Sequence, residues 1–234
     1  MLGRGDVIGL LLVYCYVASI VAISQHIRKR YGGDAQRKFI HMATGNIVLF
    51  WWVFDQAWVM AFLAAAPFVP ILLLVSPYSP IPKLRNSVLG RTTGAGHGLG
   101  LVMYAISWTI LAFIFFDNRA IASIGIVAMA YGDGFGGFVG RRYGRRKLLY
   151  GKSLEGSISV FIATSVATLA VLSYYDYLFT NSMFTVAMPS VIPSIGISLG
   201  IGAFVALVEL ITPGDIDNIV IPILTSCVVY FTGI

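Results

Sequence analysis

Charged side chains are scarce in this chain. Only 11% of its 234 residues are charged and 58% are hydrophobic, and the mean hydropathy is +0.85. Soluble domains carry about 25% charged residues, so a water-soluble fold is excluded. No Pro/Ser-rich linker or low-complexity tract divides the chain. The sequence therefore predicts an all-α, polytopic integral membrane helix bundle that forms a single domain over residues 1–234.

Cysteines are nearly absent as well. Cys15 and Cys227 both fall inside apolar segments and have no Cys or His partner at metal-binding spacing. The sequence therefore predicts neither a disulfide nor a zinc site. The net charge of +6 could indicate nucleic-acid binding. The Lys and Arg residues instead lie in short tracts beside apolar spans, and membrane topology explains them better. We expect the lipid bilayer, and no nucleic acid, as a partner.

Long apolar runs are abundant. A bilayer core of about 30 Å needs roughly 20 apolar residues in a helix. The segment 184–211 is longer than one span requires and contains Pro189 and Pro193, so it is expected to tilt, kink or begin as an interfacial turn. We predict about eight transmembrane helices, within a range of seven to nine, near 6–27, 38–54, 57–75, 99–116, 120–139, 157–175, 184–211 and 218–233.

Eight spans place nearly all the basic charge on one side of the membrane. Only Arg4 and Arg119 fall on the other side. The positive-inside rule then predicts cytoplasmic loops near 28–37, 76–98, 140–156 and 212–217, with both termini on the non-cytoplasmic side. The basic residues of the predicted cytoplasmic side are Arg28, Lys29, Arg30, Arg37, Lys38, Lys83, Arg85, Arg91, Arg141, Arg142, Arg145, Arg146, Lys147 and Lys152.

The segment 130–157 combines an acid, a glycine repeat and a dense basic cluster. An acid near a membrane interior is costly, so Asp133 indicates a functional site, although pairing with a nearby Arg is an alternative. The glycines at 132, 136, 140 and 144 share one helical face, which is typical of close helix packing. The basic residues that follow suit a polyphosphate with its divalent cation, or serve as a topology signal.

Two nucleotide-binding loops are excluded by their spacing. Gly151-Lys152-Ser153 would need a glycine at 146, where Arg146 stands, and a preceding β-strand to form a P-loop. The stretch Gly94–Gly100 does not have the spacing of a dinucleotide-binding loop.

Two further polar clusters are predicted on the cytoplasmic side. His41 shares a helical face with Arg37 at the mouth of the second span, where it is either catalytic or a structural hydrogen-bonding group. Glu209 lies in the last turn of the seventh span, where an acid opposes the helix dipole. Asp217 and Asn218 follow a Pro-Gly turn and could simply cap the last helix.

Together these motifs resemble the dolichol kinase and phytol kinase family, whose members phosphorylate membrane-embedded lipid alcohols. They run from Arg37 to Pro222 and cover most of the chain. Their most specific part is the glycine–acid stretch followed by Lys-Ser-Leu-Glu-Gly-Ser at 152–157. The same stretch also resembles phosphatidate cytidylyltransferases. The longer basic and Asp-Arg-x-Asp ending expected of those enzymes is absent here, which favours the kinases.

The resemblance implies CTP with Mg²⁺ as the phosphoryl donor and an isoprenoid alcohol acceptor whose tail lies between helices open to the bilayer. The short chain favours a polyprenol or phytol-type enzyme. Phosphoryl transfer depends mainly on positioning and charge neutralisation, which these clusters can supply. Expected metal ligands are Asp133, Glu155, Glu209 and Asp217. Expected nucleotide-binding residues are Arg37, Lys38, Gly132, Gly134, Arg141, Lys152 and Ser153. Expected catalytic residues are Asp133, His41, Lys152 and Glu155, with His41 or an acid taking the hydroxyl proton.

Three other functions stay open from the sequence alone. A CTP:lipid-phosphate cytidylyltransferase would use a phosphate acceptor and release pyrophosphate, and a CTP-dependent diacylglycerol kinase would use a different alcohol. A transporter should show charges at mid-span and often repeated halves, whereas here most charges lie at one face of the membrane and no internal repeat is found. The identity of the acceptor and the oligomeric state are not determined by the sequence.

Overall fold

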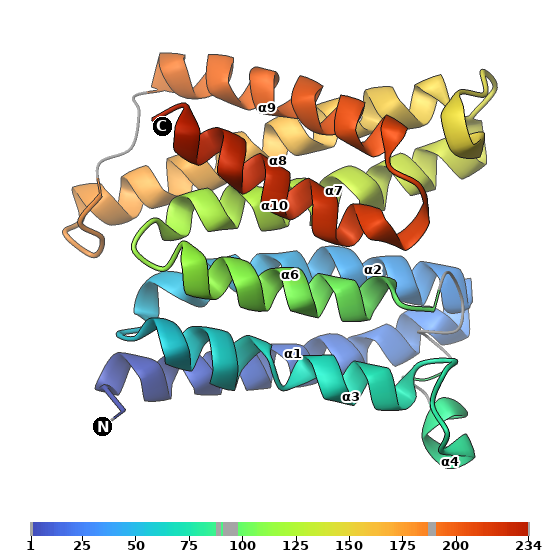
Figure 1. Ribbon diagram of the computed structural model, residues 1–234, viewed down its shortest axis with the longest axis horizontal. Coiled ribbons are helices and arrows are strands. Elements are labelled where there is room, and N and C mark those ends of the chain that lie inside the picture. Colours follow the sequence, from blue (N-terminus) through green and yellow to red (C-terminus); the bar gives the residue numbers. More distant parts are fainter. Residues whose placement is uncertain (1, 88–89, 91–97, 187–190, 234) are drawn as a thin grey trace. The chain divides into compact units, whose positions relative to one another are not determined.

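The computed structural model describes residues 2–87, 90, 98–186 and 191–233 and shows helices, with no β-strand among them (Figure 1). The prediction of an all-α membrane bundle is confirmed. The chain divides into two compact units. The N-terminal unit comprises Met1–Phe116 with Gly214–Ile219, and the C-terminal unit comprises Asp117–Pro213 with Val220–Ile234. The prediction of one domain over residues 1–234 stays a prediction.

The N-terminal unit is built from several interrupted helices. The chain leaves its first helix at Gly32, whose φ of +89° suits a residue without a side chain. The elements are α1 (Arg4–Tyr31), α2 (Gly33–Gly45), the 3₁₀ segment η1 (Asn46–Val53), the π-helical segment η2 (Val59–Ala65), α3 (Phe68–Val75), α4 (Pro82–Arg85), α6 (Gly100–Ile114) and the short η4 (Gly214–Ile216).

The core of this unit is aromatic. The ring of Trp108 on α6 stacks on Trp51 of η1 and on Phe68 of α3, with ring centroids 6.5 and 5.8 Å apart. Trp51 is fully buried. Stacked rings of this kind contribute about 0.5–1.5 kcal/mol beyond the area that they bury. They hold α6 against the two interrupted segments that precede it.

The C-terminal unit contains longer and more regular helices. They are α7 (Arg119–Tyr143), the one-turn η3 (Leu149–Gly151), α8 (Leu154–Thr180) and α9 (Val191–Ile211). The last helix, α10 (Asp217–Phe231), begins among residues of the N-terminal unit and continues into the C-terminal unit. Pro222 inside α10 cannot donate to the carbonyl of Asn218. The hydroxyl of Ser107 donates to that carbonyl instead, at 2.6 Å.

Every predicted span overlaps with helical structure, but the spans differ in the length and regularity of their helices. Among the described residues, five stretches are long and apolar enough to cross a membrane, and Val59–Val75 and Gly100–Ile114 are shorter apolar helices. The predicted span 38–54 is α-helical only to Gly45 and then continues as η1. The five long stretches are Arg4–Tyr31, Arg119–Tyr143, Leu154–Thr180, Pro193–Ile211 and Gly214–Phe231.

The predicted seventh span, 184–211, starts with non-helical residues at 184–186, which agrees with the expectation that it could begin as a turn. The helix α9 spans Val191–Ile211. Pro193 therefore lies in the first turn of α9, where its missing N–H leaves no hydrogen bond unmade. Pro189 lies outside the described residues.

Glycines bring α7 and α8 into close contact. A Cβ at Gly136 would lie 2.4 Å from a methyl of Val160, and one at Gly132 would lie 2.7 Å from the hydroxyl oxygen of Thr164. Gly140 lies directly against Gly156, with 3.6 Å between the added Cβ position and the Gly156 Cα. The glycine repeat is therefore a packing surface for α8, as its spacing predicted.

Candidate active site

A basic hairpin, residues 144–153, connects α7 to α8. Leu148 N–H donates to the Lys152 carbonyl at 2.8 Å and Leu154 N–H donates to the Arg146 carbonyl at 2.9 Å. The chain turns at Tyr150 and Gly151, both with positive φ. A side chain at φ +52°, as at Tyr150, is uncommon and marks a tightly specified turn. The hairpin exposes Arg145, Arg146 and Lys147 to the surroundings.

Lys152 turns away from these exposed cations and inward to the end of α9. Its ammonium forms an ion pair with Glu209, with 2.8 Å between Nζ and Oε1. Nζ also donates to the backbone carbonyl of Glu209 and, at 3.0 Å, to the carbonyl of Thr212. The last carbonyls of a helix carry partial negative charge, so a lysine there is favourable. Lys152 thus links the basic hairpin to the C-terminal end of α9.

Ser153 and Glu155 fix the other side of the basic hairpin. The Ser153 hydroxyl accepts the N–H of Gly156 and caps the N-terminus of α8. The Glu155 carboxylate accepts the backbone N–H groups of Arg145 and Arg146 at 3.0 and 3.3 Å. An acid in the first turn of a helix is also favoured by the helix dipole. Both side chains therefore have structural tasks in this conformation, beside the phosphate and metal roles predicted for them.

Asp133 belongs to the same unit and acts electrostatically on Glu209. Arg141 lies two helical turns further along α7 on the same face, about 12 Å along the axis at 1.5 Å per residue. Its side chain is exposed in the last turn of α7, where a cation also suits the dipole. Gly134 is buried in α7. The C-terminal unit thus carries two neighbouring carboxylates, a lysine between chain segments and exposed arginines.

The N-terminal unit holds the predicted His41 cluster. Lys38 and His41 are both buried on α2, and the His41 ring lies 5.2 Å from the ring of Tyr104 on α6. Arg37 forms an ion pair with Asp34 at 3.6 Å, one turn earlier on the same helix. The predicted shared face therefore exists, but His41 is packed against an aromatic ring and Arg37 is paired with an acid on its own helix.

The turn before α10 contains an acid, Asp215, whose contact was not predicted from the sequence. The Asp215 carboxylate accepts the N–H of Leu99 at the N-terminus of α6, 3.2 Å away. The Asn218 side chain donates to the Asp217 carboxylate at 2.9 Å and to the Asp215 carbonyl at 3.2 Å. The one sequence signal for Asp215 is its position directly after Pro213-Gly214, because its partner Leu99 is 116 residues away.

The predicted site residues are thus divided between the two units. In the C-terminal unit, Lys152 is paired with Glu209 and Asp133 acts electrostatically on Glu209. Ser153 and Glu155 lie at the end of the basic hairpin and the start of α8. Among the described residues, no group of three or more His, Cys, Asp or Glu side chains is placed to hold a metal ion. The four-carboxylate metal set, which includes Asp217 of the N-terminal unit, stays a prediction. The glycine-rich stretch 94–100 lies largely outside the described residues.

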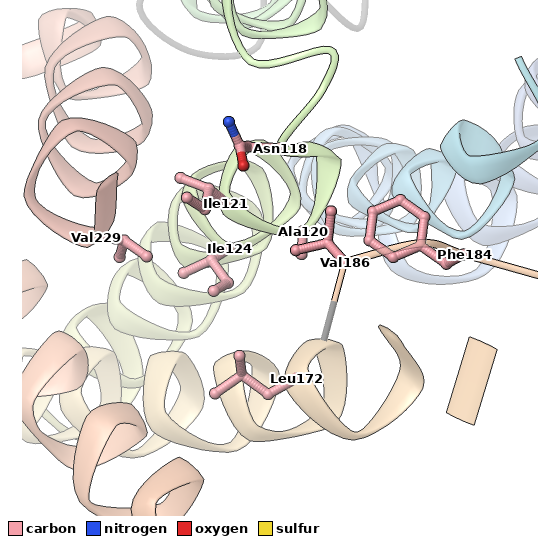
Figure 2. Close-up of a pocket in the computed structure, with 8 residues that line it drawn as sticks. All are labelled: Asn118, Ala120, Ile121, Ile124, Leu172, Phe184, Val186 and Val229. Carbon is pink, nitrogen blue, oxygen red and sulfur yellow. The ribbon is translucent and has the colours of Figure 1, made fainter. Parts of the chain in front are cut away.

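A small apolar pocket in the C-terminal unit has none of these polar groups in its lining (Figure 2). It is lined by Ile121 and Ile124 of α7 and Leu172 of α8, together with Asn118, Ala120, Phe184, Val186 and Val229. Its cavity volume of about 20 Å³ is close to the space of one water molecule. It cannot hold a nucleotide.

Comparison with known proteins shows what the chain is similar to. No family model and no solved structure matches it. It is 31% identical to phytol kinase of Synechocystis sp. over 230 residues, which cover 95% of this chain and 90% of that protein. It is 30% identical to the chloroplastic phytol kinase 1 of Arabidopsis thaliana and 28% identical to a probable phytol kinase 1 of Glycine max. It spans 66% of the length of each plant protein. The chain therefore belongs to the phytol kinase family, and the expected class of phosphotransferases acting on isoprenoid alcohols is confirmed.

Proposed function

We propose that this chain transfers the γ-phosphoryl group of CTP to a membrane-embedded isoprenoid alcohol, with phytol or a closely related prenol as the acceptor. The observation that carries the proposal is the ion pair of Lys152 and Glu209 at the basic hairpin, with Asp133 acting electrostatically on Glu209. Similarity to proteins named phytol kinase supports the acceptor class. The donor base rests on the resemblance to CTP-using kinases.

The donor set around Glu209 fits Mg²⁺. This ion is commonly held by one or two carboxylates together with substrate phosphates. Asp133 and Glu209 would supply the carboxylates, and Glu155 and Asp217 are proposed as further ligands from the sequence pattern. When bound, Mg²⁺ would neutralise charge on the β- and γ-phosphates.

The residues of the chain position the reactants. Arg141 at the end of α7 is exposed and can bind phosphate oxygens, and Arg37, Lys38 and Ser153 are proposed as further nucleotide contacts. The acceptor oxygen attacks the γ-phosphorus, the bond from that phosphorus to the β,γ-bridging oxygen breaks, and CDP leaves. His41 or a nearby carboxylate takes the hydroxyl proton. The isoprenoid tail extends along apolar helix faces, such as the exposed Ile158 and Ile162 of α8.

The experiment is a product analysis. Purified protein in detergent or vesicles is incubated with Mg²⁺, CTP or ATP labelled at the γ-phosphate, and a panel of phytol, geranylgeraniol, polyprenol, diacylglycerol and phosphatidate. We expect labelled phytyl or prenyl monophosphate and CDP, identified by mass. Release of pyrophosphate with CMP joined to phosphatidate would replace the proposal by a cytidylyltransferase. Preferred labelling of diacylglycerol would change the acceptor class.

A further inference from the structure

Lys152 has no donor to spare for a nucleotide in this conformation. A lysine ammonium carries three N–H donors. They have three acceptors at the end of α9: the Glu209 carboxylate, the Glu209 carbonyl and the Thr212 carbonyl. The lysine side chain is only 18% exposed and that of Glu209 only 10%. A phosphate could reach Lys152 only if one of these contacts broke, which leaves a buried acid without its cation.

The position of Glu209 near a second acid explains why a lysine lies beside it. Asp133 and Glu209 are two acids within electrostatic range of each other in an apolar unit. Like charges at short range repel, and a cation between chain segments offsets the repulsion. The backbone of Lys152 is also held in place, by the hydrogen bonds of the basic hairpin and by the cap at Ser153.

We infer that Lys152 is a positioning residue that holds the Glu209 carboxylate in place beside Asp133 for the divalent cation, while other cations bind the nucleotide phosphates. This inference rests on the proposed function. It changes the role predicted from the sequence, in which Lys152 contacts phosphate. Groups that orient a metal ligand typically change metal affinity by about 10- to 100-fold when they are removed.

The test separates the metal requirement from nucleotide binding. Lys152→Met should raise the Mg²⁺ concentration for half-maximal activity by at least about tenfold. At saturating Mg²⁺ its KM for CTP should stay within about twofold of wild type, since no phosphate contact is lost. Glu209→Gln should have a similar effect, and the double variant should be little worse than either single variant. Lys147→Met, the same change at an exposed position of the basic hairpin, is the matched control and should keep the wild-type Mg²⁺ requirement.

Opposite outcomes overturn the inference. A raised KM for CTP with an unchanged Mg²⁺ requirement in Lys152→Met would assign Lys152 to the phosphates. Lower thermal stability with wild-type kinetics per folded molecule would leave only its role as a cap of α9. If Lys152→Met does not fold, Glu209→Gln decides, because it keeps both carbonyl acceptors of Lys152. An unchanged Mg²⁺ requirement in that variant refutes the inference.

Direct binding of Mn²⁺ in the presence of CTP, followed by electron paramagnetic resonance, separates this inference from the proposed function. Weaker Mn²⁺ binding in Lys152→Met supports the positioning role even if the wild-type protein phosphorylates none of the alcohols. In that case the proposed function fails alone. If the wild type is an active kinase and the variant binds Mn²⁺ as tightly as wild type, the inference fails alone.

Discussion

Two buried acids, Asp6 of the N-terminal unit and Glu209 of the C-terminal unit, are stabilised in different ways. Asp6 of the N-terminal unit is fully buried at the start of α1. It accepts the backbone N–H groups of Gly3, Asp55 and Gln56 and the side-chain amide of Gln56, at 2.7–3.1 Å. Glu209 of the C-terminal unit lies at the end of α9 and is paired with Lys152.

The two acids differ in the kind of partner that stabilises each of them. The four donors of Asp6 are neutral, and three belong to the backbone, so they anchor the turn after η1 to the start of α1. The negative charge of Asp6 also suits the N-terminal end of a helix. Glu209 lies at the unfavourable end of its helix, with a second acid acting on it electrostatically, and the ammonium of Lys152 balances its charge. Burial alone therefore does not distinguish a structural acid from a functional one, and the kind of partner does.

The largest effect is expected at Asp133, one of the two acids proposed to bind the metal ion. Asp133→Asn should lower metal-dependent turnover by at least about 100-fold, or roughly 2.7 kcal/mol in activation free energy, because a metal-ligand charge is lost. The fold should persist. Turnover at saturating CTP over a range of Mg²⁺ concentrations, with thermal unfolding in the same detergent, measures both quantities. Retention of most wild-type turnover would remove Asp133 from the mechanism.

The corresponding change at the structural acid should have the opposite profile. Asp6→Asn replaces an accepting oxygen by an NH₂ group that faces N–H donors. Hydrogen bonds to charged groups contribute about 1.5–3 kcal/mol each, and each kcal/mol lost lowers Tm by roughly 2–4 °C in a chain of this length. We expect a clearly lower melting temperature with unchanged Mg²⁺ dependence per folded molecule. A changed Mg²⁺ requirement would end the contrast between the two acids.

A smaller effect is expected from the packing of the helix that carries Glu209. A Cβ at Gly202 would lie 2.1 Å from the Ser165 hydroxyl oxygen and 2.7 Å from the Phe161 carbonyl oxygen. Gly202→Ala should destabilise the protein by about 1–3 kcal/mol through overpacking. Gly200 on the same helix has nothing within 4 Å of an added Cβ. Gly200→Ala is therefore the matched control and should be neutral or slightly stabilising. Equal melting temperatures for the two variants would contradict this packing.

The smallest perturbation tests on which sides of the membrane the two acids lie. In a variant in which serine replaces Cys15 and Cys227, a single cysteine is introduced by Arg145→Cys on the basic hairpin or by Arg4→Cys near Asp6. Both arginines are exposed. A membrane-impermeant maleimide should label position 4 in intact cells and position 145 only after permeabilisation, with little effect on folding. Labelling of position 145 from outside would reverse the predicted topology.

Much of the fold was predictable because helix formation in a membrane follows apolar length. The long spans α1, α7 and α8 satisfy their backbone hydrogen bonds internally, so their sequences locate them without knowledge of their neighbours. Residues 184–186 also belong to the predicted apolar span, yet they are not helical. Hydropathy does not report where the backbone departs from helical geometry, nor that the span from residue 38 changes to a 3₁₀ segment at Asn46.

The candidate site was predictable in its residue types and less so in their partners. The glycine repeat and the acid at 133 were recognisable because their spacing is local. The acceptors of Lys152 lie 57 and 60 residues further along the chain. The donors to Glu155 are backbone N–H groups that become available only when the basic hairpin forms. A charge pattern cannot distinguish a lysine that binds phosphate from one that caps a distant helix.

The sequence by itself determined that this chain is a membrane helix bundle of the phytol kinase family, because composition, span length and ordered motifs are properties of the chain read in one direction. Only the tertiary structure decided which charges meet. It paired Lys152 with Glu209, and it brought the Glu155 carboxylate to the backbone N–H groups of the basic hairpin. It also packed the glycine face of α7 against α8. The physical reason is that a buried charge is stabilised only by groups within a few ångströms, and helix packing brings those groups together from distant parts of the sequence.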